Sequence, residues 1–459
     1  MKTTAITIPF YSGKAEIELP LEADVLQMTG AIPLADPKTV IEKVLENPIN
    51  CSSLRSIIKK KKESKESPKA VIVISDNTRP VPYKGESGIL MPIITILMAG
   101  NIPVKDILIL VATGTHRPLT DDELRSMLDQ KVFDLGIPII NHDCKDAEHL
   151  THLGVTSRGT QIYIDSYYID ADIKILTGLV ESHFMAGASG GRKSICPGLV
   201  GETGTFIFHG PEMLDHPKST DLVLAGNPCH EEALEVAKTA GADFIVNVTL
   251  DSTFAVSGVF TGELEAAHAA AVEQVIKHIG VPFEKSYDVV ISHAGFVGIN
   301  HYQAAKTGST AQKVVKPGGF VILAAENIDS AHPVGALTYR TTLQLLKLLG
   351  AEKFMKLIKS PDWVFIPEQW QVQMWSKLFS HIPMDNFYYY SPQFTPEHYA
   401  VVPGIDGSQY VSSTSITQAA QEFYLGALED AANRMDKQIN ELSVAILLDG
   451  PYGIPVRKL

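Results

Sequence analysis

Continuous apolar stretches recur along the first half of the chain, and they predict buried strands. AVIVIS at residues 70–75 and DILILVA at 106–112 lack the alternation with polar residues that a half-solvated strand would show. DIKILTG at 172–178 and FIVNVTL at 244–250 are of the same kind. Such strands are typical of sheets that are covered on both faces.

Segments with helical spacing separate these strands. Residues 88–100 are predicted to form a helix with Pro92 in its first turn, where the missing N–H costs no hydrogen bond. Residues 121–130 are predicted to form another helix, with Thr120 as its N-cap. The alternation of strand and helix predicts a parallel sheet with helices on both faces.

The pattern restarts in the second half of the chain. A helix predicted over 264–280 is followed by VPFEKS at 281–286, which we interpret as a hinge. Beyond it we predict a strand at 287–295, a helix at 304–315 and a strand at 320–326.

With 459 residues the chain is long enough to bury two cores. We therefore predict an α/β protein of two domains, each with a mostly parallel sheet flanked by helices, and an active site in the interdomain cleft. The expected N-terminal domain spans 1–278, beginning with a hairpin over 3–20, and the C-terminal domain spans 286–410. A strand-like run, SVAILLDG, leads us to expect that 412–459 returns to the N-terminal domain.

Charge and composition narrow the classes of function. A net charge of -13 disfavours nucleic acids and anionic membranes as partners. The longest apolar run, ILMPIITILMAG, falls short of the roughly 18 residues that a membrane-spanning helix needs. The four cysteines include no C-x-x-C pair, so neither a zinc knuckle nor a disulfide scaffold is indicated. We expect a cytoplasmic protein in which residues 59–69 form a charged, solvated segment.

Titratable and polar side chains follow several of the predicted strands. In doubly wound sheets, ligands bind just beyond the carboxyl ends of the strands. Each of these side chains alone has an ordinary structural explanation, such as a surface ion pair, but their common placement indicates a site. They are Asp76, Arg79, His116, His183 and Lys193 in the first half, and Tyr302, Gln303 and Lys306 in the second.

The segment GASGGRKS around Lys193 invites comparison with the phosphate loop G-x-x-x-x-G-K-[ST]. It differs at one place, because Arg192 stands where the motif has glycine. A glycine-rich backbone can still hold a phosphate through exposed N–H groups. A phosphate- or nucleotide-dependent enzyme, such as a kinase or hydrolase, therefore stays open as an alternative function.

Five blocks of sequence together resemble the lactate racemase family, whose members use a nickel pincer cofactor. The blocks are SDNTRP, TGTHRP, GLVESHFMAGASGGRKSICPG, FHG and HYQAAK. The resemblance implies an isomerase, a racemase or epimerase that inverts C2 of lactate or a related 2-hydroxy acid. It also implies two cofactor components, nickel and pyridinium-3,5-bisthiocarboxylic acid mononucleotide, loaded with the help of cofactor-biosynthesis proteins.

The resemblance assigns roles to residues of this chain. Lys193 would carry the cofactor through a thioamide, and His209 would be the protein ligand of nickel, with the cofactor supplying the other donors. His116 and His183 would be the two bases, one for each enantiomer. The cofactor phosphate would lie against the glycine loop at Ser189, Gly190 and Gly191. The substrate would be bound by Asp76, Arg79, Tyr302, Gln303, Lys306 and, by a looser match, Trp370.

The implied reaction makes chemical sense. Removing the C2 hydrogen as a proton would place a carbanion beside the carboxylate, whereas removing it as a hydride avoids that second charge. The product is a 2-keto acid, and return of the hydride to its other face inverts the centre. A non-catalytic carrier of the nickel nucleotide is a further alternative, and the oligomeric state, a homo-oligomer included, stays open.

Overall fold

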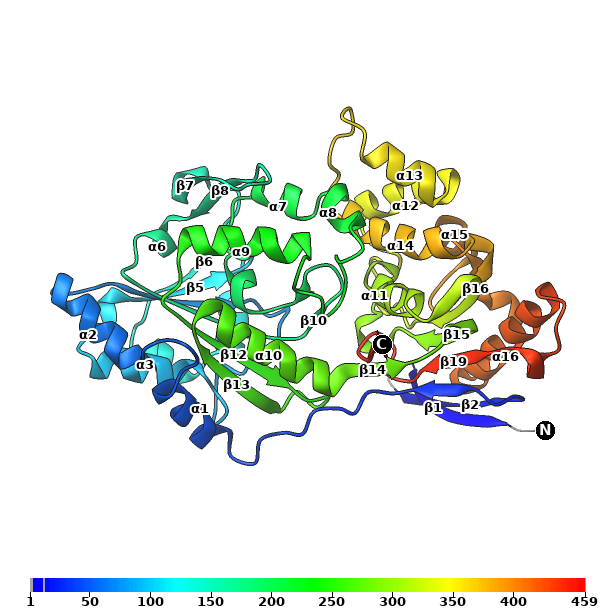
Figure 1. Cartoon of the computed structure of the whole chain (residues 1–459), viewed down its shortest axis with the longest axis horizontal. Coiled ribbons are helices and arrows are strands. Elements are labelled where there is room, and N and C mark those ends of the chain that lie inside the picture. The colour runs from blue at the N-terminus through cyan, green and yellow to red at the C-terminus, as the bar shows by residue number, and fades with distance from the viewer. Residues whose placement is uncertain (1–2, 11–12, 459) are drawn as a thin grey trace. The chain divides into compact units, whose positions relative to one another are not determined.

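The computed structural model describes residues 3–10 and 13–458, which form two compact units (Figure 1). The central unit comprises Gly30–His209 and His216–His278. The terminal unit combines both ends of the chain, up to Thr29 and from Ile279 onward, with the short segment Gly210–Asp215. The prediction of two α/β units with mostly parallel sheets is confirmed.

The central unit is built around a six-stranded sheet. Its strand order is β13 (Val256–Gly262), β12 (Phe244–Leu250), β9 (Ile173–Leu179), β4 (Ala70–Ser75), β5 (Ile107–Ala112) and β6 (Ile139–Asn141). Every pair is parallel except the antiparallel pair of β12 and β13. Ile72 on the central strand pairs with Ile109 and Ile175 and is fully buried, as its continuous apolar run predicts.

The helices and short strands of the central unit follow the predicted alternation. Pro92 lies in the first turn of α3, and Thr120 forms a capping box with Glu123, so both predictions are confirmed. Of the charged run 59–69 that we expected to be a solvated segment, residues 59–64 form the second half of α2 and residues 65–69 follow it. The helices are α1 (Pro37–Glu46), α2 (Leu54–Ser64), α3 (Leu90–Ala99), α4 (Asp121–Met127), α5 (Gln130–Asp134), α6 (Ser166–Ile169), α7 (Gly204–Phe208), α9 (Pro228–Ala240), α10 (Leu264–Ile279), η1 (Val104–Asp106), η2 (Ala147–His149) and η3 (Gly191–Ser194), and the short strands are β7 (Leu150–Val155), β8 (Gln161–Asp165), β10 (Ser182–His183) and β11 (Gly187–Ala188).

The strand order of the central sheet reverses between β4 and β9. From β4 the chain proceeds to β5 and β6 on one side, and it then returns to β9 and β12 on the other side. Such a switch point leaves a crevice beyond the carboxyl ends of the two central strands, and ligands bind there. The loops after β4 and β9 are those that carry Asp76, Arg79, His183 and Lys193.

The terminal unit contains a second six-stranded sheet, and all of its strand pairs are parallel. Its order is β18 (Ile405–Asp406), β17 (Phe387–Tyr390), β16 (Val315–Ala324), β15 (Tyr287–His293), β19 (Val444–Leu447) and β3 (Asp24–Leu26). This order also reverses once, between β15 and β19. The second sheet thus has a switch point of its own.

Helices and a hairpin cover the second sheet. The hairpin of β1 (Thr4–Phe10) and β2 (Gly13–Leu19) packs with α16 on one face, sharing a hydrophobic core with β15, β16 and β19. The remaining elements are α8 (Pro211–Asp215), α11 (His301–Gln312), α12 (Leu337–Leu349), α13 (Ala351–Ile358), α14 (Gln369–His381), α15 (Pro396–Val401), α16 (Ile416–Arg434), η4 (Gly295–Val297), η5 (Met384–Asn386), η6 (Gly407–Tyr410), η7 (Ile439–Glu441) and the parallel pair β14 (Gly280–Phe283) with β20 (Ile454–Arg457).

Two expectations about chain organisation are wrong, and the segment of a third lies beside the chain boundary between the two units at His278 and Ile279. Residues 412–459 do not return to the N-terminal domain, because β19 pairs with β15 of the second sheet. The hairpin belongs to the terminal unit, although its turn at residues 11 and 12 lies outside the described residues. The segment 281–286, interpreted as a hinge, begins with strand β14, which pairs with β20.

No helix in the described part of the chain combines the length and the apolar character needed to cross a membrane.

Candidate functional site

Asp76 orients His116 at the carboxyl end of the central sheet. Asp76 directly follows β4 and is buried, and its Oδ2 lies 2.6 Å from Nδ1 of His116 in the loop after β5. Its Oδ1 accepts hydrogen bonds from the Thr78 N–H (3.1 Å) and hydroxyl (2.5 Å). Burial acts to raise the pKa of Asp76, but the hydrogen bonds from His116 and Thr78 outweigh it, and the pKa is lowered.

This pairing fixes the tautomer of His116. With Nδ1–H donated to a carboxylate, a neutral imidazole has its lone pair on Nε2. The ring is 57% exposed, so Nε2 is accessible to a ligand. His116 therefore has the geometry of a general base held by a carboxylate.

Lys193 and His183 form the second centre of the site. The Lys193 Nζ lies 3.2 Å from Nε2 of His183. Burial, followed by the charges of Arg192 and Arg79, lowers the pKa of Lys193 to about 7. Near neutral pH a large fraction of this side chain is thus an uncharged, nucleophilic amine.

The hydrogen bonds of His183 agree with a neutral Lys193. Nδ1 of His183 accepts from the backbone N–H groups of Met185 (3.3 Å) and Ala186 (3.2 Å). A neutral imidazole that accepts at Nδ1 carries its proton on Nε2, and that proton points at Nζ. An uncharged amine can accept this hydrogen bond, whereas an ammonium cannot.

His209 lies near the same amine. The Lys193 Nζ is 5.2 Å from the centre of the Phe208 ring, and the His209 ring packs edge-on against Phe208 with centroids 4.8 Å apart. Burial and, secondarily, the charge of Lys193 lower the pKa of His209 to about 3. His209 is therefore a neutral imidazole over the physiological range, which is the form that binds metals.

The glycine loop holds Lys193 in place, and the N–H groups of Ser189 and Gly191 are bonded within the protein. The Ser189 N–H donates to Glu181 O (2.9 Å), and its hydroxyl donates to Leu179 O (2.8 Å). The Gly191 N–H donates to Asn247 Oδ1 (2.9 Å). A phosphate cradle at Ser189, Gly190 and Gly191, as we expected, would need these groups to face a ligand, and this geometry does not support it.

The two glycines are needed for close packing. Gly190 has φ +71°, and a Cβ there would lie 2.7 Å from Val180 Cγ2. Gly191 has φ +53°, and a Cβ would lie 2.8 Å from the ring of His268. The loop therefore turns tightly into η3 and places Lys193 at the switch point.

Arg192 is a buried cation beside Lys193. Its Nη2 donates to Ala186 O (2.7 Å), and its Nη1 lies 3.0 Å from Nε2 of His268. No carboxylate pairs with it among the described residues. Since a guanidinium remains charged, it contributes to the low pKa of the neighbouring amine.

Arg79 is paired with a residue that the sequence analysis did not identify. Its Nε lies 3.4 Å from Oε1 of Glu181, and both side chains are partly exposed. Glu181 is the second residue after β9, and its backbone N–H donates to the Ser189 hydroxyl oxygen (2.9 Å). A substrate carboxylate at Arg79 would therefore compete with Glu181.

Two residues that support the Lys193 loop, Asn247 and His268, were missed although each is a polar residue in an apolar stretch of sequence. Asn247 is a polar residue within the apolar strand FIVNVTL, and His268 interrupts an alanine-rich helix. Both are buried and support the Lys193 loop. A buried polar side chain requires a partner, so their positions could have indicated the loop.

The predicted substrate residues of the second half gather within the terminal unit. Tyr302, Gln303 and Lys306 lie on the first turns of α11 and are partly exposed. Trp370, at the start of α14, donates from Nε1 to the Tyr302 hydroxyl (2.9 Å). Gln371 Nε2 donates to Tyr302 O (2.8 Å), so α14 holds the beginning of α11.

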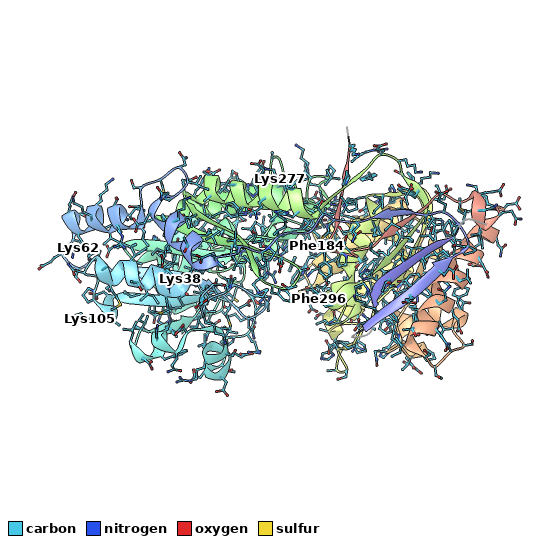
Figure 2. The ribbon with its side chains drawn as sticks, turned by 90° about the horizontal axis from the view of Figure 1, so that it is seen from below. Lys38, Lys62, Lys105, Phe184, Lys277 and Phe296 are labelled. Atoms are coloured by element: carbon cyan, nitrogen blue, oxygen red, sulfur yellow. The ribbon has the colours of Figure 1, made fainter. Side chains whose placement is uncertain are left out.

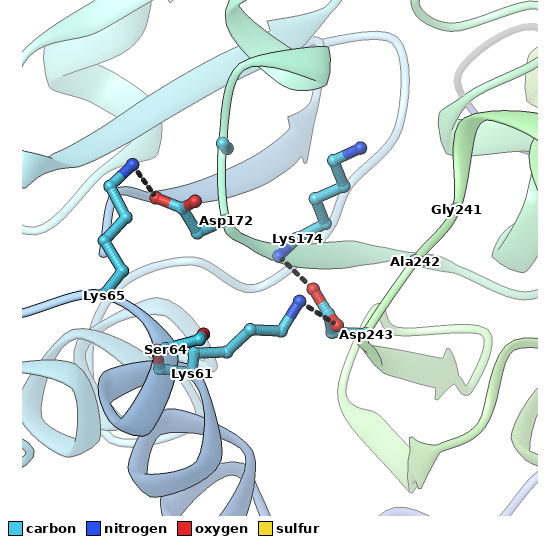
Figure 3. A pocket seen from close by; sticks show the side chains of 9 residues that line it. Lys61, Ser64, Lys65, Asp172, Lys174, Gly241, Ala242 and Asp243 are labelled. Carbon is cyan, nitrogen blue, oxygen red and sulfur yellow. Dashed lines mark hydrogen bonds and ion pairs between the residues drawn. The ribbon is translucent and has the colours of Figure 1, made fainter.

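A separate pocket of about 460 Å³ lies away from this site (Figure 3). It is at the amino ends of β9 and β12, whereas Lys193 follows the carboxyl end of β9. Its charges are largely paired, Lys61 with Asp243 at 2.8 Å and Lys65 with Asp172 at 2.7 Å. Figure 2 shows Lys62 and Lys105 at one end of the central unit and Phe184, the neighbour of His183, at the other.

The sequence and the fold are similar to those of known lactate racemases. The lactate racemase N-terminal domain matches residues 11–221. The lactate racemase of Lactiplantibacillus plantarum is 33% identical over 351 residues, which cover 76% of this chain and 78% of that protein. The lactate racemase of Thermoanaerobacterium thermosaccharolyticum is 28% identical over 379 residues, 81% of this chain and 85% of the relative.

Solved structures show the same architecture. The lactate racemase apoprotein from Thermoanaerobacterium thermosaccharolyticum superimposes with a TM-score of 0.81 at 24% identity, covering 99% of this chain and 100% of that chain. A protein from Thermotoga maritima has a TM-score of 0.57 at 15% identity, covering 93% of this chain and 100% of that one. Both likenesses describe the fold.

The low pKa of Lys193 predicts unusual reactivity. In protein free of any cofactor, acetylation of Lys193 should rise with pH about a midpoint near 7, whereas exposed lysines with an ordinary pKa of about 10.4 react slowly there. Competitive labelling with peptide mass spectrometry measures both. Lys193→Arg, which cannot be acetylated, identifies the peptide, and a midpoint near the ordinary value would contradict the assignment of a neutral amine.

Proposed function

Because this chain belongs to the lactate racemase family, a family of isomerases, we propose that it inverts C2 of a 2-hydroxy acid, lactate or a related acid. The observation that carries the proposal is the position of Lys193, whose Nζ lies 3.2 Å from Nε2 of His183 and 5.2 Å from the ring centre of Phe208, the neighbour of His209. Across the same switch point stands His116, with its tautomer set by Asp76. A nucleophile, a neutral nitrogen ligand and two oriented imidazoles meet the needs of the family's cofactor and reaction.

The residues present fit a nickel pincer nucleotide. Lys193 would hold it by condensing its amine with a thiocarboxylic acid group, giving a thioamide and water. His209 would supply one nitrogen donor to nickel. No group of three or more His, Cys, Asp or Glu in the described residues could hold a metal ion by itself, so the sulfur and carbon donors of the nucleotide would complete the site.

When bound, the cofactor supplies an acceptor for the C2 hydrogen as a hydride. His116 takes the hydroxyl proton of one enantiomer at Nε2, and the Asp76 carboxylate stabilises the imidazolium that forms. Arg79 binds the substrate carboxylate through its guanidinium after leaving Glu181. The positive charge of the His116 imidazolium thus lies beside the Asp76 carboxylate, and the negative charge of the substrate carboxylate lies beside the Arg79 guanidinium.

His183 serves the opposite enantiomer. In the unmodified protein its Nε2–H donates to the Lys193 amine. A thioamide nitrogen no longer accepts a hydrogen bond but donates one, so attachment of Lys193 would remove the acceptor of the His183 Nε2–H. Nδ1 would stay bonded to the N–H groups of Met185 and Ala186, and Nε2 would be left to exchange a proton with the substrate.

Tyr302, Gln303, Lys306 and Trp370 are proposed as further substrate contacts. The resemblance supports them, and so does their clustering on α11 and the start of α14. The alternative of a phosphate- or nucleotide-dependent enzyme is less well supported, because the N–H groups of Ser189 and Gly191 are already bonded. A carrier of the cofactor would not need His116 to be oriented by a buried carboxylate.

A substrate deuterated at C2 tests the proposed chemistry. We expect the loaded protein to give the other enantiomer with deuterium retained, because a hydride returned by the cofactor does not exchange with water. Chiral chromatography followed by mass spectrometry measures inversion and label together. Loss of deuterium to solvent at the rate of inversion would indicate a carbanion and would contradict the proposal.

Replacement of Asp76 tests the orientation of His116. In Asp76→Asn the amide NH2 would donate to Nδ1 and move the imidazole proton to Nε2, so kcat should fall by roughly 10²-fold, the scale of a lost general base. Thr78→Val is the matched control, because it removes a hydrogen bond to Oδ1 and leaves the bond to His116 intact. Equal rates for Asp76→Asn and the parent would show that Asp76 does not set the tautomer.

A further inference from the structure

At the switch point of the second sheet, the loop after β15 packs against the turn after β19. In an open parallel sheet, the crevice between the two strands where the order reverses is the usual place for a ligand. Here those strands are β15 and β19. The loop after β15, residues 294–300, meets the turn after β19, residues 448–453, and several contacts join them.

Tyr452 makes the central contacts. Its hydroxyl oxygen accepts a hydrogen bond from the Val297 N–H (3.0 Å). Its ring stacks on Phe296, with centroids 5.0 Å apart and an interplanar angle of 14°. At Gly295, φ is +54° and a Cβ would lie 2.7 Å from Tyr452 Cε2, so the loop approaches the ring as closely as only glycine permits. Figure 2 labels Phe296, which is 64% exposed.

His293 fastens the other end of the turn. Its Nε2–H donates to Leu448 O (2.8 Å), and its Nδ1 accepts from the Gly295 N–H (3.1 Å). Gly450 passes so close that a Cβ there would lie 2.3 Å from His293 O. The turn after β19 is therefore attached to the loop after β15 at two places.

The same loop leads directly into α11. Asn300 is the N-cap of α11, and its Oδ1 accepts from the Gln303 N–H (3.0 Å). The Asn327 N–H and amide donate to Gly298 O in the same loop at 2.9 and 3.1 Å. Tyr452 and Asn327 thus both hold the loop that leads into the first turn of α11.

We propose that Tyr452 is a positioning residue for substrate binding. It braces the loop 294–300 and thereby fixes the first turn of α11, which presents Tyr302, Gln303 and Lys306. Tyr452 itself touches neither substrate nor cofactor. The inference rests on the proposed function, because it requires that α11 bind the 2-hydroxy acid.

Two substitutions separate the contributions of Tyr452. Tyr452→Phe keeps the stacking on Phe296 and removes the hydrogen-bond acceptor, whereas Tyr452→Ala removes both. With cofactor-loaded protein and lactate, we expect KM to rise by about 2- to 10-fold in Tyr452→Phe, the scale of one hydrogen bond, and further in Tyr452→Ala. kcat and the loaded cofactor mass should stay unchanged, because the brace affects binding and Lys193 lies in the central unit.

Hydrogen exchange of residues 294–303 provides a readout that needs no substrate. Exchange there should speed up in Tyr452→Ala and, less, in Tyr452→Phe. Tyr410→Ala is the matched control, a partly buried tyrosine of the same unit that packs on Tyr388. It should change neither KM nor exchange in this loop.

The outcomes are distinguishable. Unchanged exchange in Tyr452→Ala would overturn the brace. Faster exchange with an unchanged KM would show that α11 does not depend on the brace for binding, and would also overturn the proposal. A parent protein that is loaded but inactive on every 2-hydroxy acid would overturn the proposed function and the substrate role of α11, while the exchange data would still report on the brace.

Discussion

The contact between the Lys193 amine and His183 is the interaction on which the site depends, because it holds Nζ 3.2 Å from Nε2 of the imidazole. Two features make protonation of this amine unfavourable: its burial and the neighbouring charges of Arg192 and Arg79. Both arginine side chains are held by neighbouring groups. Arg192 is buried and donates to the carbonyl oxygen of Ala186, and Arg79 is paired with Glu181. A lysine with a lowered pKa is a better nucleophile at neutral pH than an ordinary lysine, which suits the role proposed for Lys193.

The surrounding structure serves to hold that amine at the switch point. Asn247 and His268 come from β12 and α10, and both bind the backbone of the glycine loop. The N–H groups of Ser189 and Gly191 are therefore bonded within the protein. In the terminal unit the same principle recurs, because the turn after β19 fills its own switch point and leaves α11 to present polar side chains. Each sheet thus offers one side-chain cluster at its carboxyl end.

Sequence patterns predicted the parts of the fold that local physics determines. The strands β4, β5, β9 and β12 were identifiable because their apolar runs have no other stable location than a sheet covered on both faces. Strand β6 was missed because only three residues pair, and β13 because glycines interrupt it. The assignment of 412–459 failed for a different reason: an apolar strand does not reveal which of two parallel sheets it will join.

The site was predictable where chemistry requires a residue type, and unpredictable where only the fold decides a contact. His116, His183 and Lys193 stand in loops that the strand pattern placed together, and their roles came from the family resemblance. His209, at the end of α7, came from the resemblance alone. The pairing of Asp76 with His116 and of Arg79 with Glu181 depends on side-chain directions across neighbouring loops, which sequence does not give. The phosphate contact expected at Ser189, Gly190 and Gly191 stays a prediction, because glycine content alone does not show where the N–H groups point, and those of Ser189 and Gly191 are bonded within the protein.

The central claim is that Lys193 is the nucleophile that carries the cofactor, and the intact mass of the protein tests it most directly. The parent and Lys193→Ala would each be produced together with a pathway that makes the nickel pincer nucleotide, and the nickel content of the same samples would be determined. The account predicts a mass increase in the parent and none in Lys193→Ala. A parent protein of unmodified mass, from a pathway that loads the Lactiplantibacillus plantarum lactate racemase, would contradict it.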